Sequence, residues 1–271
     1  MMRNIPSSLP WKTAWITGAG RGIGESVAKL LCHYGLTVYA SARNSSELNN
    51  LKNSCCNELG LIVPIPMDIT DPRQIDDMML SWDQGHGVPD LVILNAGTHD
   101  PFPAHEFSAE RCSKLLRTNL QGTINCIDPV LKRFIKRNSG QLAVMASVAG
   151  YRGLPTAAAY GASKAALINL CEALRLDLKG TDIKLQVINP GFVRTPLTDK
   201  NDFKMPALME PEEAAVEILN GLLGRRFEIC FPKRFVYLLK FLRLLPYSWY
   251  FGLLEKSVKV EPETEAVDKH G

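Results

Sequence analysis

Short apolar runs alternate with longer amphipathic segments along almost the whole chain, and this alternation constrains the fold more than any other feature. Seven short runs have the length and composition of buried β-strands, at 14–16, 37–40, 61–65, 91–94, 141–146, 184–188 and 227–231. Helical patterns occupy 23–34, 46–58, a segment that begins at Thr70-Asp71-Pro72, 109–136, 157–179 and 211–222. Nearly continuous apolar strands separated by helices predict an α/β fold built on a doubly wound parallel sheet of about seven strands.

One domain accounts for most of this pattern. A chain of 271 residues is long enough for one large α/β domain, and no linker or internal repeat divides it. We expect a single domain over 1–231, which includes a substrate loop at 192–210. A basic amphipathic helical extension at 232–259 and a polar tail at 260–271 complete the predicted organisation.

Composition and residue spacing exclude several classes of protein. An apolar fraction of 46% with 22% charged residues excludes wholesale disorder, and a net charge of +3 is too small to indicate nucleic acid as the main partner. Seven scattered cysteines without a C-x-x-C pair predict reduced thiols, and five histidines without i,i+3 or i,i+4 pairs predict no metal site. Residues 1–11 lack the apolar run of a signal peptide, and no apolar stretch reaches 18 residues, so we expect a cytoplasmic protein.

The turn after the first predicted strand is rich in glycine. It reads Thr17-Gly18-Ala19-Gly20-Arg21-Gly22-Ile23-Gly24 and leads into a helix. Glycines allow a sharp turn and close approach of a pyrophosphate, while the helix N-terminus supplies N–H donors and a positive potential. A turn of this kind predicts a nucleotide site, although a glycine turn that binds nothing is the alternative.

Further motifs give this turn a specific meaning. The spacing T-G-x-x-x-G-x-G occurs together with Asn95-Ala96-Gly97, Thr118-Asn119-Leu120-Gln121-Gly122, Ser147, a Tyr160-x-x-x-Lys164 pair and Pro190-Gly191. In this order and spacing the motifs resemble the short-chain dehydrogenase/reductase family, of the single-domain, NADP(H)-preferring type with a Rossmann fold. The resemblance covers about residues 10 to 230. Leu94 departs from the family, which often has a second asparagine there, but this position lies on the strand side.

The resemblance implies a catalytic group of Asn119, Ser147, Tyr160 and Lys164. Tyr160 would exchange a proton with a carbonyl or alcohol, Ser147 would bond the substrate oxygen, and Asn119 would position a relay water beside Lys164. From the residues alone, Tyr160 and Lys164 share a helix face because they are four positions apart. A nearby ammonium favours the phenolate, and so would an oxidised nicotinamide ring, so we expect the two together to hold the pKa of Tyr160 below its ordinary value.

The end of the second strand indicates which cofactor is preferred. An NAD site usually has an acidic residue there, whereas this chain has Ala42 followed by Arg43, and Arg21 lies in the glycine turn. Two guanidinium groups suit a ribose 2′-phosphate, so we expect NADP(H). The predicted cofactor contacts, several of them implied by the resemblance, are Gly18, Arg21, Gly22, Ile23, Gly24, Ser41, Arg43, Asp68, Ile69, Asn95, Ala96, Gly97, Tyr160, Lys164, Pro190, Val193 and Thr195.

Three segments are expected to build the substrate pocket: 98–107, 148–156 and 192–209. They carry the apolar side chains Phe102, Phe107, Leu154, Phe192, Phe203, Met205, Leu208 and Met209, with core packing or a dimer contact as the alternative reading. An apolar lining predicts a hydrophobic carbonyl or alcohol substrate. His99 and His105 lie nearby, but their spacing requires no catalytic role.

The segment 233–256 reads KRFVYLLKFLRLLPYSWYFGLLEK. On a helical projection its Lys and Arg residues fall on one broad side, and Phe235, Leu238, Leu239, Leu242 and Leu245 on the other. Pro246 is expected to break the helix, and the aromatic residues that follow favour membrane interfaces. The segment therefore predicts either a helix that lies on a membrane surface or one that covers the cleft or packs on a partner subunit.

These observations together predict an NADP(H)-dependent oxidoreductase that interconverts a carbonyl and an alcohol on a hydrophobic, lipid-like or steroid-like substrate. A 3-oxoacyl thioester reductase is one alternative, and a catalytically silent NADP(H)-binding sensor or scaffold is another. The resemblance also implies a homodimer or homotetramer paired through the helices near 109–136 and 157–179.

Overall fold

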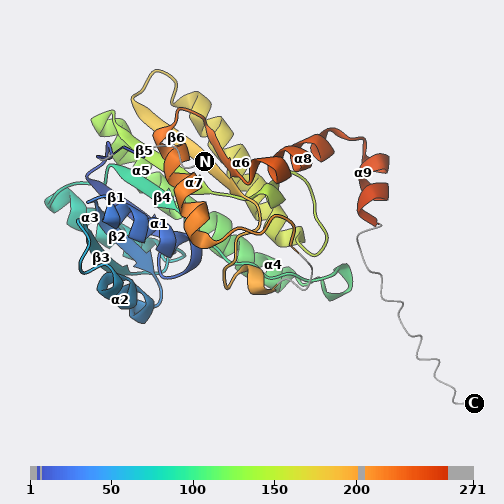
Figure 1. Ribbon diagram of the computed structural model, residues 1–271, viewed down its shortest axis with the longest axis horizontal. Helices are drawn as coiled ribbons and strands as arrows, with labels where there is room; N and C mark the ends of the chain where they lie inside the picture. The colour runs from blue at the N-terminus through green and yellow to red at the C-terminus, as the bar shows by residue number, and fades with distance from the viewer. Residues whose placement is uncertain (1–4, 7, 201–204, 256–271) are drawn as a thin grey trace, which may run out of the picture.

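The computed structural model describes residues 5–6, 8–200 and 205–255. Within this part of the chain one sheet has seven parallel strands in the order β3-β2-β1-β4-β5-β6-β7 (Figure 1). The strands are β1 (Thr13–Thr17), β2 (Thr37–Ala42), β3 (Leu61–Pro66), β4 (Leu91–Leu94), β5 (Gly140–Met145), β6 (Ile183–Pro190) and β7 (Glu228–Phe231). The predicted doubly wound parallel sheet is therefore confirmed.

Helices cover both faces of the sheet. They are α1 (Gly22–His33), α2 (Ser45–Ser54), α3 (Pro72–Gln84), α4 (Ala109–Leu116), α5 (Gly122–Arg137), α6 (Ala158–Asp177), α7 (Pro211–Leu223), α8 (Lys233–Leu244) and α9 (Tyr247–Leu254). Apolar side chains of α1, α2 and α7 form one core against the sheet, and those of α3, α5 and α6 form a second core on the opposite face. Each strand is thus shielded from water on both sides, as its nearly continuous apolar sequence requires.

Short polar side chains determine where several helices begin. Asn44 accepts hydrogen bonds from the backbone N–H groups of Ser46 and Glu47 at the start of α2. Asp71 accepts one from Arg73 N–H at 3.1 Å, and Pro72 occupies the first turn of α3, as the sequence predicts. These caps fix the entry points of the helices into the sheet.

The order of the strands creates a crevice at one edge of the sheet. β1 pairs with both β2 and β4, and the chain winds outward from it in opposite directions. Parallel sheets bind ligands at the carboxyl ends of the strands beside such a reversal. The loops that follow β1 and β4 therefore meet where a ligand site is expected.

The long helix expected over 109–136 is interrupted. A π-helical turn at Arg117–Gln121 separates α4 from α5 and carries Asn119. The hydroxyl of Thr123 donates a hydrogen bond to the carbonyl of Asn119 at 2.8 Å. Single π turns inside α-helices are frequent at functional sites, and periodicity does not reveal them because the apolar pattern continues across the insertion.

The C-terminal helices α8 and α9 project from the end of the domain (Figure 1). Phe235 and Leu239 pack against the core of the domain, and Val236 is fully buried there. The prediction that this segment has a single apolar face is wrong. Leu238 belongs to a second, exposed apolar face, which the helical projection did not separate from the face that packs on the domain. The predicted break at Pro246 is confirmed, since α8 ends at Leu244 and α9 begins at Tyr247. Among the described residues no helix has the length and apolarity needed to cross a membrane.

Candidate active site

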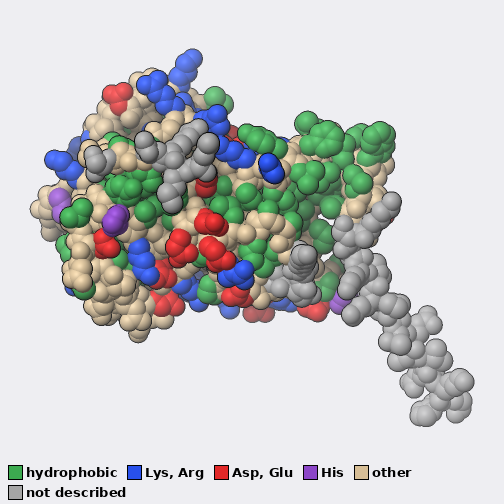
Figure 2. Space-filling model, viewed as in Figure 1, with side chains coloured by type: hydrophobic (Ala, Val, Ile, Leu, Met, Phe, Trp, Pro, Cys, Tyr) green, Lys and Arg blue, Asp and Glu red, His purple; other side chains and the backbone are tan. Residues whose placement is uncertain are grey.

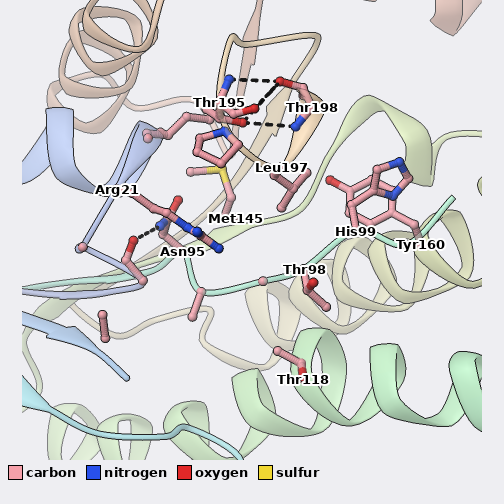
Figure 3. Close-up of a pocket in the computed structure, with 18 of the residues that line it drawn as sticks. Arg21, Asn95, Thr98, His99, Thr118, Met145, Tyr160, Thr195, Leu197 and Thr198 are labelled. Carbon is pink, nitrogen blue, oxygen red and sulfur yellow. Dashed lines mark hydrogen bonds between the residues drawn. The ribbon is translucent and has the colours of Figure 1, made fainter. Parts of the chain in front are cut away.

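A cleft of about 790 Å³ opens at the carboxyl ends of the strands. Its walls come from the glycine turn after β1, the ends of β2 to β6, the helices α4 and α6, and the segment after Pro190 (Figure 3). Of the predicted site residues, the following line it: Gly18, Arg21, Gly22, Ile23, Ser41, Arg43, Asp68, Ile69, Asn95, Ala96, Gly97, Ser147, Tyr160, Lys164, Pro190, Val193 and Thr195. Gly24 and Asn119 lie behind this lining.

The glycine turn permits contacts that no other residue would allow. Gly18 has φ +66°, and a Cβ there would lie 2.7 Å from the Cα of Ala96. A Cβ at Gly24 would lie 2.3 Å from the carbonyl oxygen of Gly18, so this glycine brings α1 close to the turn rather than touching a ligand. The N-terminus of α1 consequently borders the cleft with its N–H groups and positive potential, which suits a phosphate.

Asn95 holds the ends of the two central strands together. Its side-chain amide donates to the carbonyls of Thr17 and Gly18 at 3.1 and 3.0 Å. The buried hydroxyl of Thr17 accepts hydrogen bonds from the backbone N–H groups of Asn95 and Ala96 at 3.0 and 3.1 Å. These reciprocal bonds fix the floor of the cleft where the glycine turn passes over β4.

Ser147, Tyr160 and Lys164 meet in the wall opposite the glycine turn. Ser147 follows β5 and is buried, with its hydroxyl accepting a hydrogen bond from Ala149 N–H at 3.1 Å. Tyr160 and Lys164 project from consecutive turns of α6, as their spacing predicts, and the Lys164 Nζ lies 5.6 Å from the centroid of the Tyr160 ring. Lys164 is 3% exposed and donates a hydrogen bond to the Met145 carbonyl at 2.8 Å.

The pKa of Tyr160 differs from the expectation. Burial raises the pKa of Tyr160 above its ordinary value, while a hydrogen bond with Ser147 acts in the opposite direction. The same burial lowers the pKa of Lys164 to about 8. The expected lowering relies on Lys164 together with an oxidised nicotinamide ring; among the protein's own groups, removal of the phenolate from water outweighs the polar contacts. A neutral phenol is the form that donates a proton.

Asn119 has a fixed place beside this group. Its side-chain oxygen accepts a hydrogen bond from Thr98 N–H at 2.7 Å, and its amide donates to the Thr98 carbonyl at 2.9 Å. Gly97 lies between Asn119 and Lys164, since a Cβ built on it would be 3.4 Å from Asn119 Oδ1 and 3.6 Å from Lys164 Nζ. The backbone of Thr98 thus fixes the side chain of Asn119, and the Oδ1 of Asn119 and the Nζ of Lys164 both lie next to Gly97.

The opposite end of the cleft carries the predicted arginines. Arg21 and Arg43 are exposed at its edge, and neither forms an ion pair within the described part of the chain. Ser41 is buried and its hydroxyl accepts a hydrogen bond from Trp15 Nε1 at 2.8 Å. Asp68 accepts a hydrogen bond from Thr70 N–H at 2.9 Å and lies beside Ile69 in the wall.

Several lining residues have no role in the sequence prediction, among them Glu47 and His99. Glu47 lines the end that holds the arginines, and a Cβ on Gly20 would lie 2.5 Å from its Oε2. Its signal in the sequence is the capping pattern Asn44-x-x-Glu47, which directs the third residue of α2 back toward the turn. His99 is buried, and its ring packs edge-on against Tyr160 with the centroids 4.6 Å apart (Figure 3). Its position two residues after Gly97 indicates proximity to the site.

The apolar set predicted for the substrate pocket is not found in this cleft. None of its described members belongs to the lining, and Phe203 lies outside the described residues. Phe102 is buried with Leu115 and Ala159, behind Tyr160, whereas Phe107 is 63% exposed. The described part of the chain also contains no group of three or more His, Cys, Asp or Glu residues placed to hold a metal ion.

Comparison with known proteins agrees with this arrangement. The sequence profile of the short chain dehydrogenases matches residues 12–205. An uncharacterized oxidoreductase of Myxococcus xanthus (strain DK1622) is 33% identical over 89% of this chain and 95% of its own length.

Two solved structures superpose well on this fold. A short-chain dehydrogenase from Streptomyces avermitilis has a TM-score of 0.76 at 24% identity, covering 92% of this chain and 98% of that one. A single-residue variant of actinorhodin polyketide ketoreductase, solved with NADPH, has a TM-score of 0.73 at 25% identity and covers 81% of this chain and 95% of its own.

Proposed function

This chain belongs to the short-chain dehydrogenase/reductase family, a family of oxidoreductases, and from that premise we propose that it interconverts a carbonyl and an alcohol on a hydrophobic substrate with NADP(H). Tyr160 is the acid/base of the proposed reaction. One observation carries the proposal: Ser147, Tyr160 and Lys164 line the same cleft as the glycine turn.

The residues of the cleft fit a dinucleotide. Gly18 and Gly22 line the cleft without side chains, and the N-terminus of α1 borders it. Lys164 would hold the nicotinamide ribose at the far end, while Asp68 and Ile69 would border the adenine. The cofactor supplies the hydride when bound.

The remaining chemistry belongs to the protein. In reduction, the neutral phenol of Tyr160 donates its proton to the carbonyl oxygen, and the hydroxyl of Ser147 stabilises the charge that develops there. The buried ammonium of Lys164 stabilises the phenolate that remains. Asn119 presents its side-chain oxygen to the space beside Lys164, where a water would return a proton to the site.

The preference for NADP(H) rests on charge at the adenosine end. Arg21 and Arg43 have no carboxylate partner among the described residues and border the cleft, so both are available to a 2′-phosphate. Glu47 opposes them but leaves a positive balance. The ketoreductase relative, solved with NADPH, supports the same choice.

NADPH oxidation across a panel of hydrophobic ketones tests the proposal. We expect turnover of at least one ketone, and faster turnover with NADPH than with NADH at equal concentrations. Tight NADPH binding without oxidation by any ketone of the panel would instead indicate a sensor or scaffold. Equal affinities for NADPH and NADH would contradict the cofactor preference.

A further inference from the structure

We propose that α8 and α9 form a docking surface for an anionic phospholipid bilayer. The two helices lie on the membrane plane, insert exposed aromatic and leucine side chains, and place their free cations against lipid phosphates. The surface, here named the C-terminal arm, comprises residues 233–254. This proposal concerns a partner of the protein and stands independently of the reaction proposed above.

Apolar exposure in the described chain is concentrated on this arm. Eight of the fourteen exposed large hydrophobic side chains lie between positions 237 and 253. They are Tyr237, Leu238, Phe241, Leu244, Tyr247, Trp249, Phe251 and Leu253. In Figure 2 hydrophobic side chains gather over α8 and α9, at the end of the molecule away from α2 and β3. Such a concentration of exposed apolar side chains in one segment indicates an interaction site.

The exposed face is distinct from the face that holds α8 to the domain. Phe235, Val236 and Leu239 are directed to the core, while Tyr237, Leu238 and Phe241 occupy the opposite side of the same helix. The helix therefore has two apolar faces, of which the fold uses one. The second face needs a partner outside the described residues to remove it from water.

The arm is held firmly in this position. Arg152 donates hydrogen bonds to the carbonyls of Leu242 and Leu245, both at 2.8 Å, at the end of α8. Its guanidinium carbon lies 3.9 Å from the centroid of the Tyr250 ring, and the hydroxyl of Tyr250 donates to the carbonyl of Gly153. Lys240 pairs with Glu228 at the base of α8. These contacts fix the exposed side chains as one surface and leave them outside the fold.

The charges of the arm indicate which kind of partner covers it. Between Glu228 and Glu255 the chain has four cations and no carboxylate. Lys240 is paired, but Lys233, Arg234 and Arg243 are exposed and form no ion pair within the described residues. A second copy stacked on this face would bring like charges together, whereas an anionic bilayer supplies phosphates to the cations and hydrocarbon to the rings. Tyr and Trp are the residue types that favour the boundary between the two.

The arm is attached to the segment that joins two of the proposed catalytic residues. Arg152 and Gly153, which hold it, belong to the segment between Ser147 and Tyr160. If the proposed reaction is correct, docking brings this segment to the lipid surface, and the substrate class becomes carbonyl compounds dissolved in the bilayer. This step rests on the proposed function, while the docking itself does not.

Vesicle flotation of the full-length protein tests the docking. We expect flotation with vesicles of equal parts phosphatidylcholine and phosphatidylglycerol, weak flotation with phosphatidylcholine alone, and release by salt. Lys233→Gln with Arg234→Gln should lower the partition coefficient about fivefold for each charge removed, and Phe241→Ser with Trp249→Ser about tenfold or more. Leu59→Ser, which removes a leucine 85% exposed beside α2 and β3, is the matched control and should float like the wild type.

Tryptophan fluorescence of the wild-type protein provides a second readout. Trp249 is 68% exposed, whereas Trp11, Trp15 and Trp82 are 7% exposed or less. Anionic vesicles should shift the emission to the blue and protect it from an aqueous quencher, and Trp249→Phe should abolish the shift.

Absent flotation, or equal flotation of the Phe241→Ser/Trp249→Ser protein, would overturn the proposal. Dissociation of an oligomer by that variant, without vesicle binding by the wild type, would assign the face to a second copy instead.

The reaction is tested separately with a ketone presented in anionic vesicles and in free solution. The arm variant should lose activity only with the vesicle-borne ketone, and equal loss in both would contradict delivery from the bilayer. Flotation without turnover of any ketone would contradict the proposed reaction and leave the docking intact.

Discussion

The Nζ of Lys164 lies 5.6 Å from the ring centroid of Tyr160, and burial disfavours the charged form of both groups, so that their pKa values shift in opposite directions. Burial raises the pKa of Tyr160 and lowers that of Lys164 to about 8. The phenol therefore remains protonated through neutral pH, while the ammonium is held close to its titration range. Both the pH dependence and the stability of the protein follow from this pair.

The rate of carbonyl reduction should fall as the pH rises through about 8. Lys164 loses its proton there, and with it the charge that stabilises a Tyr160 phenolate. Lys164→Arg keeps the charge and should move the decline to higher pH, even if its turnover is lower. Initial rates measured from about pH 6 to about pH 10 check this. A rate unchanged across this range would contradict the role given to Lys164.

Lys164→Met should stabilise the fold while removing activity. The folded pKa is lowered from 10.5 to about 8, so at pH 7 both folded and unfolded chains are charged and the full cost of burying the ammonium is present. Methionine removes that cost but leaves the Met145 carbonyl without its partner, for a net gain of about 2 kcal/mol in unfolding free energy. Urea unfolding at neutral pH measures it.

The gain from Lys164→Met should shrink as the pH rises from about 8 to 10.5, because the wild type then releases the proton on folding and its own stability increases. A destabilised Lys164→Met protein would contradict the cost assigned to burying the ammonium.

Gly97→Ala isolates the space between Asn119 and Lys164. The new methyl group would lie 3.4 Å from Asn119 Oδ1 and 3.6 Å from Lys164 Nζ, ordinary contact distances, so the fold should tolerate it. It would nevertheless occupy the place where a relay water is proposed. We expect turnover to fall about tenfold or more with little change in the thermal midpoint. Gly153→Ala, where a Cβ meets nothing within 4 Å, is the control. Unchanged turnover would remove the water from the mechanism.

Cofactor preference should respond to charge in opposite ways at Arg43 and Glu47. Arg43→Ala should weaken NADPH binding about tenfold and leave NADH binding nearly unchanged, because only NADPH carries the 2′-phosphate. Glu47→Gln removes a carboxylate from the same end of the cleft and should tighten NADPH binding about fivefold. Calorimetric titration of both cofactors measures the four affinities. Parallel changes for NADPH and NADH would contradict the assignment of this end to the phosphate.

Much of the fold and of the site could be predicted because the decisive signals are local. Buried parallel strands require continuous apolar runs, and the glycine turn requires residues without a Cβ, as Gly18 and Gly24 show. Tyr160 and Lys164 share a face of α6 because residues four positions apart are neighbours on a helix surface. The carboxyl ends of β4, β5 and β6 then bring the motif residues to one crevice.

The remaining features depend on tertiary packing, which spacing does not encode. Glu47 lines the cleft because α2 packs beside β2 and β3, and the ring of His99, in the loop after β4, contacts the ring of Tyr160 from α6. Burial, not sequence distance, sets the Tyr160 pKa. The two faces of α8 become distinguishable only when one of them is docked. Pairing of subunits through the helices near 109–136 and 157–179 stays a prediction.

The central claim is that Tyr160 exchanges a proton with the substrate, and Tyr160→Phe tests it most directly. Reduction of a ketone turned over by the wild type should be measured with saturating NADPH, and NADPH affinity should be measured in parallel by titration. Loss of the proton donor should lower turnover by about 10²- to 10⁴-fold while NADPH still binds. Turnover by Tyr160→Phe within a few-fold of the wild type would contradict the account.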